Sequence, residues 1–92
     1  MQRKSVSKQD IENLFNVIAR VDSPDDCRKL FEDLCTDKEI EKMAQRIKAA
    51  QLLIEGKTYN EVINQTDISS ATLSRVSRCV QYGSGYSNIL KK

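Results

Sequence analysis

The fold is decided by Thr66-Asp67-Ile68-Ser69-Ser70-Ala71-Thr72-Leu73-Ser74-Arg75-Val76, a stretch that predicts a turn followed by a helix. Ser69 is expected to accept a hydrogen bond from a free amide of the first helical turn. Leu73, Val76 and Val80 fall on one stripe of the helix, which is expected to face the protein core. The helix therefore has an inner and an outer side.

The outer side of this helix is small, hydroxylated and basic when about 100° is taken per residue. It carries Ala71, Ser74, Arg75 and Arg78, with Ser69, Ser70 and Thr72 near its N-terminal end. Such side chains suit a DNA major groove, because Arg pairs with guanine or phosphate, Ser and Thr bind either, and Ala contacts thymine methyls. The pattern is typical of a DNA-recognition helix; a solvated helix face of the same composition is the alternative.

Another short helix is expected directly before this one. Thr58 and Glu61 match a capping box, in which the two side chains satisfy open amides at a helix start. The helix is expected to end near Gln65. Lys57 and Asn60 lie at its beginning, and both are further candidates for contacts with DNA.

The turn between the two helices completes a helix-turn-helix over about residues 58–80. Thr66-Asp67 forms the turn, and Ile68 is expected to fill the space between the helices. Two positions depart from the commonest pattern: Ile63 stands where a small Ala is usual, and Asp67 where Gly is usual. Asp tolerates a left-handed backbone better than most residues do.

Start signals for three further helices precede this region. Ser7 is expected to cap a helix that runs to about Val21, and Ser23-Pro24 begins the next one. Thr36 opens a capping box and a long helix that stops at Gly56. These long amphipathic helices carry more apolar positions than two short helices can cover.

Composition favours an all-α fold. The chain has 92 residues, which fits a single domain over residues 1–92, and only 5% of them are aromatic. Trp and His are absent, and there are three Gly and one Pro. Six helices are expected, the last a short one after Tyr82-Gly83-Ser84-Gly85-Tyr86.

Several function classes are disfavoured by residues that the chain lacks. Without His, neither a Ser-His-Asp nor a Cys-His arrangement can form, and no Gly-rich phosphate loop is present. Cys27, Cys35 and Cys79 are too widely spaced for a zinc site, and are expected to be buried or half-buried. We expect no enzyme activity, no metal and no resident cofactor. No apolar run or signal peptide is evident, so a cytoplasmic protein that does not enter a membrane is expected.

Charge is divided unevenly along the chain. Residues 10–41 hold ten acidic and four basic side chains, whereas residues 68–92 hold four basic side chains and no acidic one. The basic end is the end with the predicted helix-turn-helix. This asymmetry would direct the basic side toward phosphates and make binding weaken as salt rises.

The surplus of apolar positions predicts a homodimer. A twofold dimer would cover them and would place two recognition helices on successive turns of the major groove, about 34 Å apart. The alternative is that the first three helices close the core of a monomer.

Several motifs in order resemble the Trp repressor superfamily, and more narrowly its YerC/YecD-like branch. They are Leu34-Cys35-Thr36-Asp37-Lys38-Glu39-Ile40, Ala44-Gln45-Arg46, Leu52-Leu53-Ile54-Glu55-Gly56, Ala71-Thr72-Leu73-Ser74-Arg75 and the ending Tyr82-Gly83-Ser84-Gly85-Tyr86. The resemblance covers most of residues 8–90. It implies a six-helix, intertwined homodimer that binds double-stranded operator DNA, with Ser70, Ala71, Thr72 and Ser74 where that family contacts DNA.

The resemblance also bears on an effector. Thr36, Arg46 and Arg75 match positions that line the corepressor pocket of the tryptophan-binding members. Val76 stands where those members have Gly, and Cys79 where they have Ser. Because Val76 would fill part of an indole slot at a cost of about 1 to 3 kcal/mol, tryptophan is not the expected effector. An unidentified small acidic effector could pair with the two arginines, although Arg46 can also pair with a neighbouring glutamate.

Two functions remain open. The first is a dimeric, sequence-specific transcriptional regulator, most simply a repressor. The second is a helical protein–protein interaction module that keeps the fold without specific DNA binding. It stays open because the recognition helix carries only two arginines, and because the preceding helix has the apolar Ile63.

Overall fold

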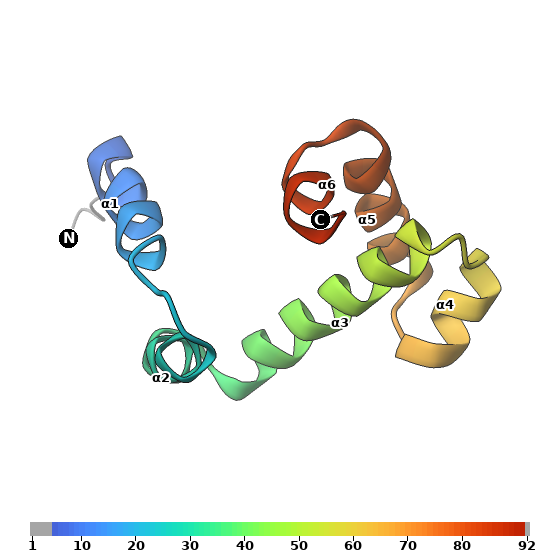
Figure 1. The fold of residues 1–92 in the computed structure, drawn as a ribbon, viewed down its shortest axis with the longest axis horizontal. Coiled ribbons are helices and arrows are strands. Elements are labelled where there is room, and N and C mark those ends of the chain that lie inside the picture. The colour runs from blue at the N-terminus through green and yellow to red at the C-terminus, as the bar shows by residue number, and fades with distance from the viewer. Residues whose placement is uncertain (1–4, 92) are drawn as a thin grey trace. The chain divides into compact units, whose positions relative to one another are not determined.

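Serine and threonine side chains begin most helices of the structure, a computed structural model that describes residues 5–91. The helices in this range are α1 (Lys8–Ile18), α2 (Pro24–Leu34), α3 (Asp37–Ile54), α4 (Tyr59–Thr66), α5 (Ser70–Tyr82) and α6 (Gly85–Leu90) (Figure 1). The hydroxyls of Ser7, Ser23 and Ser69 each accept a hydrogen bond from the backbone N–H three residues later, at 3.1, 3.1 and 3.2 Å. Thr58 and Glu61 form the expected capping box, with distances of 3.2 and 2.9 Å.

The all-α prediction is confirmed, since the described residues form six helices and no strand. Two boundaries were wrong. The first helix ends at Ile18 rather than near Val21. The N–H groups of Arg20 and Val21 donate to the carbonyls only three residues before them, at 3.1 and 3.0 Å, which is not the α-helical pattern. The last helix begins at Gly85, inside the segment that was expected to precede it.

The chain divides into two compact units, residues 1–36 and 37–92, and the first unit has no buried side chain in its helices. In α1, Ile11 is 44% exposed and Phe15 is 57% exposed; in α2, Leu34 is 50% exposed. Cys27 is also exposed, so its predicted burial was wrong. It lies on the same side of α2 as Phe31 and Leu34, and this apolar side is not buried within the chain.

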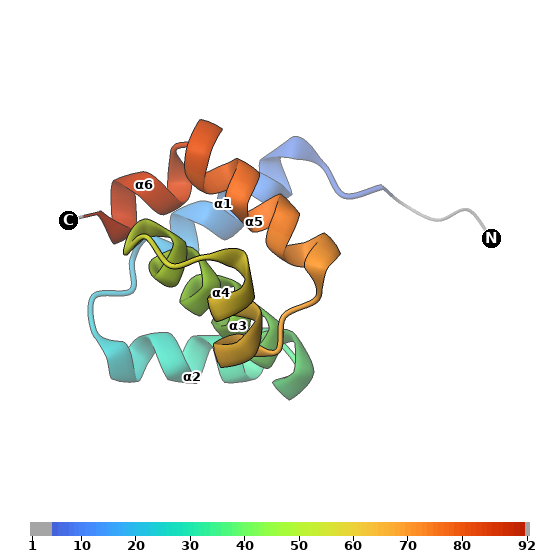
Figure 2. The same ribbon diagram turned by 90° about the vertical axis from the view of Figure 1, so that its right-hand side faces the viewer.

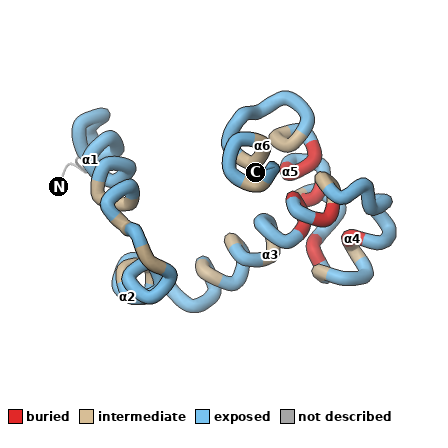
Figure 3. Tube along the Cα trace, in the orientation of Figure 1, coloured by how far each residue is buried: buried red, intermediate tan, exposed pale blue. Residues whose placement is uncertain are grey.

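The second unit is built around the C-terminal half of α3. Figures 1 and 2 show α4, α5 and α6 gathered around it, and α3 packs against all three. The core consists of seven buried apolar residues from α3, α4, the turn after α4, and α5 (Figure 3): Ala49, Ala50, Leu52, Val62, Ile68, Leu73 and Val76. The two alanines have small side chains, which allow the other helices to approach α3 closely.

No helix within residues 5–91 combines the length and apolar character that a membrane span requires. The same part of the chain contains no group of three or more Cys, Asp or Glu side chains that could hold a metal ion. The prediction of one domain over residues 1–92 stays a prediction.

Candidate nucleic-acid interface

The inner side of α5 is fixed in the core. Leu73 is completely buried and Val76 is 2% exposed, while Val80 is half-buried and packs against the core cluster. Ser77 is 5% exposed, and its hydroxyl accepts a hydrogen bond from the Gln81 side chain at 3.5 Å. The predicted apolar stripe is confirmed, and it determines which residues α5 presents to solvent.

The opposite side of α5 is open to solvent. Its four predicted residues are all exposed, and we refer to them as the α5 outer face: Ala71, Ser74, Arg75 and Arg78. Together with Cys79 they line a groove of about 500 Å³. The exposure of these residues is as predicted, whereas their contact with DNA stays a prediction.

The two arginines of the α5 outer face have no acidic partner among residues 5–91. Ion pairs in this range include those of Asp25 with Arg28 and Lys29 within α2, at 3.6 and 3.2 Å. No acidic residue occurs after Asp67 in the sequence. Arg75 and Arg78 are therefore cations that no neighbouring carboxylate neutralises, and they can pair with an external anion.

Two hydrogen bonds between Ser69 and Thr72 hold the N-terminal end of α5. Besides accepting from the Thr72 N–H, the Ser69 hydroxyl donates to the Thr72 Oγ1 at 2.9 Å. Ser69 thus uses both its donor and an acceptor within the protein. The Thr72 hydroxyl keeps its own proton for an outside acceptor, and Ser70 is exposed beside it.

Asp67 forms the turn before α5. Its backbone is left-handed, with φ of 60°, and its N–H donates to the Ile63 carbonyl at 2.8 Å. Ile68 is 2% exposed and fills the core next to the turn, as predicted. The Thr66 hydroxyl donates to the Val62 carbonyl at 2.7 Å and accepts from the Ile68 N–H at 3.3 Å.

A long-range hydrogen bond attaches this turn to α3. The Gln45 Nε2 donates to the carbonyl oxygen of Thr66 at 2.8 Å, across 21 residues of sequence. Both groups are partly buried. Sequence reasoning missed this contact, because a half-buried Gln on an amphipathic helix gives no local signal of its partner.

Lys57 and Asn60 lie at the beginning of α4, and both are exposed. α4 packs against α5 as well as α3. The structure therefore leaves both side chains free to reach a ligand bound by the α4–turn–α5 segment.

Three residues were predicted to bind an effector: Thr36, Arg46 and Arg75. Arg46 is exposed on α3 and has no ion pair with a described residue. Arg75 lines the groove along α5, but Arg46 is not among the described residues that line it. Thr36 is exposed at the end of the first unit. Val76 is buried in the core, which gives it a structural role.

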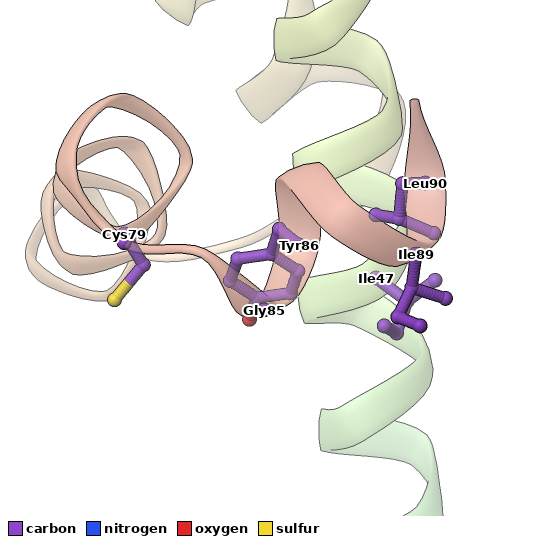
Figure 4. Close-up of a pocket in the computed structure, with 7 residues that line it drawn as sticks. Ile47, Cys79, Gly85, Tyr86, Ile89 and Leu90 are labelled. Carbon is purple, nitrogen blue, oxygen red and sulfur yellow. The ribbon is translucent and has the colours of Figure 1, made fainter. Parts of the chain in front are cut away.

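An apolar pocket of about 410 Å³ lies where α3, the end of α5 and α6 meet (Figure 4). It is lined by Ile47, Cys79, Gly83, Gly85, Tyr86, Ile89 and Leu90. Gly83 is required by the close approach of the backbone, because a Cβ there would lie 2.7 Å from the Cys79 carbonyl oxygen. The sequence analysis did not predict this pocket, although the apolar spacing of Tyr86, Ile89 and Leu90 could have indicated it.

Comparisons with known proteins agree with this arrangement. The family profile of the Trp repressor protein matches residues 9–92. The uncharacterized protein YerC of Bacillus subtilis (strain 168) is 41% identical over 83 residues, which cover 90% of this chain and 80% of YerC.

Two solved structures have the same fold. A TrpR-like protein from Eubacterium eligens superposes with a TM-score of 0.84 at 38% identity, covering 91% of this chain and 88% of that one. A candidate Trp repressor from Staphylococcus aureus superposes with a TM-score of 0.85 at 34% identity, covering 92% and 86%. The profile match and these relatives show that the chain belongs to the Trp repressor family.

Proposed function

We propose that this protein is a dimeric, sequence-specific DNA-binding regulator of transcription, most simply a repressor. The observation that carries the proposal is the α5 outer face: two arginines with no acidic partner among residues 5–91, beside small side chains, on a helix whose opposite side is buried in the core. Small residues let the helix backbone approach base edges closely. Arginines can then reach guanine or phosphate, which is the requirement for major-groove recognition.

The α4–turn–α5 segment would act as a helix-turn-helix. In that layout the second helix lies in the major groove while the first crosses the phosphate backbone. Lys57 and Asn60 are exposed where α4 begins, which suits contacts with phosphates. Thr72 and Ser70 lie at the N-terminal end of α5, where free backbone amides also favour an anion.

The exposed apolar sides of α1 and α2 support a homodimer. Ile11, Leu14 and Phe15 are between 38% and 57% exposed, and no residue of α1 or α2 is buried. A second copy would cover these side chains, at about 25 cal/mol for each Å² removed from water. Twofold symmetry would then present two α5 helices to an inverted-repeat operator.

We propose further that an effector, if it binds this protein, is a small acid near Arg46 and Arg75. Both guanidinium groups are exposed and lack a described ion-pair partner, so a carboxylate or phosphate could engage them. In a thermal-shift screen, we expect at least one acidic metabolite to raise the melting temperature. Tryptophan is expected to have no effect, because Val76 would fill part of the slot for its indole ring. A screen without any stabilising acid would contradict this proposal.

A protein-interaction module is the second candidate, and the apolar pocket beside α6 is the observation that favours it. An Arg75→Ala change separates the two functions. Loss of an Arg contact to a base or phosphate costs about 1 to 3 kcal/mol, so DNA binding should weaken about fivefold to 150-fold while the dimer persists. Arg28→Ala is the matched control, because Arg28 already has Asp25 as its partner. Equal affinities of wild type and Arg75→Ala would favour the interaction module.

A further inference from the structure

Tyr82 is the last residue of α5, and its side chain is 83% exposed. Its phenolic hydroxyl has no hydrogen-bond partner among the described residues. Tyrosines with an accessible ring and a free hydroxyl are enriched at binding interfaces, where the ring supplies contact area and the hydroxyl a directed hydrogen bond.

The position of Tyr82 on α5 places it with the α5 outer face. Ala71, Arg75, Arg78 and Tyr82 follow one another at steps of four, three and four residues. At about 100° per residue, Tyr82 lies only about 20° around the helix from Ala71, between the directions of the two arginines. It therefore points away from the core, as its exposure also shows.

The length of α5 indicates which part of DNA Tyr82 would meet. Ala71 and Tyr82 are eleven residues apart, which is about 16 Å along the helix axis. The major groove is only about 12 Å wide. When the N-terminal end of α5 lies at the base edges, its C-terminal turn reaches the wall of the groove, which is the phosphate backbone.

We propose that Tyr82 is a DNA-binding residue that donates its phenolic hydrogen to a backbone phosphate, one helical turn beyond Arg78. This assignment rests on the proposed DNA-binding function. Arg78 would supply charge to the same stretch of backbone, and Tyr82 a neutral donor. The two residues would therefore contribute differently to salt dependence, since only a cation releases counterions from DNA.

The test compares three variants with wild type on an operator duplex selected by the wild-type protein. Tyr82→Phe removes only the hydroxyl, and the expected result is about tenfold weaker binding. The slope of log affinity against log salt should stay unchanged for Tyr82→Phe, and should fall by about 0.9 for each phosphate that Arg78→Ala releases. Tyr86→Phe is the matched control, because Tyr86 lines the apolar pocket on α6; its affinity should equal that of wild type.

Operators altered at single base pairs complete the test. A phosphate contact carries no sequence information, so Tyr82→Phe should weaken binding to all of them by the same factor. Wild-type affinity in Tyr82→Phe, a loss confined to one base pair, or a dissociated dimer would each overturn the assignment. Failure of the wild-type protein itself to bind any duplex would instead overturn the proposed function, and this assignment with it.

Discussion

Removing the Gln45 side chain is expected to loosen the turn before α5. The Gln45 Nε2 donates to the Thr66 carbonyl at 2.8 Å, and both groups are partly buried. In Gln45→Ala this carbonyl loses its side-chain donor, which costs about 0.5 to 1.5 kcal/mol of unfolding free energy. For a domain of this size, each 1 kcal/mol corresponds to about 4 to 8 °C in melting temperature.

A second substitution at the same position separates the hydrogen bond from packing. In Gln45→Glu an ionised carboxylate, which can only accept, would face the Thr66 carbonyl oxygen. The loss of stability should therefore exceed that of Gln45→Ala, although Glu has almost the same shape as Gln. Lowering the pH below the ordinary pKa range of a glutamate should restore part of the lost stability, because the protonated carboxyl can donate again.

The assay is thermal and urea unfolding followed by circular dichroism. All variants must be compared at one protein concentration, because the stability of a dimer depends on concentration. The Gln51→Ala variant is the control, since Gln51 is exposed on the same helix. An unchanged midpoint in Gln45→Ala, or a Gln45→Glu protein as stable as wild type, would refute the role given to this hydrogen bond.

Three further outcomes follow from backbone and surface geometry. Gly83→Ala should lower the urea midpoint, because the new Cβ would lie 2.7 Å from the Cys79 carbonyl oxygen. Gly85→Ala is the control: no atom lies within 4 Å of its Cβ, so its unfolding free energy should stay within about 0.5 kcal/mol of wild type. Asp67→Ala should destabilise by about 1 kcal/mol in thermal unfolding, and Asp67→Gly should be the more stable of the two, because φ is 60°. Phe15→Glu should convert the proposed dimer into a monomer, as measured by light scattering; a dimer of unchanged mass would exclude this surface from the subunit contact.

Local rules were sufficient to predict much of α4, the turn and α5. Ser69 and Thr58 begin their helices through hydrogen bonds within one turn, so the residues themselves reveal them. The core position of Leu73 follows from helical periodicity. Asp67 could be assigned a left-handed backbone because few other residues tolerate one.

Features that depend on distant packing were not predictable in the same way. The partner of Gln45 lies 21 residues away, and no local pattern specifies it. The exposure of Tyr82 became evident only when the end of α5 was defined. Cys27 was wrongly predicted to be buried or half-buried, since it is exposed on α2.

The most direct measurement of the central claim is selection of bound sequences from a random duplex library by the purified protein at near-physiological salt. The α5 outer face and the exposed apolar sides of α1 and α2 predict an enriched inverted repeat, with half-sites about one helical turn (34 Å) apart. Arg75→Ala should weaken the enrichment while leaving the proposed dimer intact. A folded dimer that enriches no sequence would contradict the claim that this protein is a sequence-specific DNA-binding regulator.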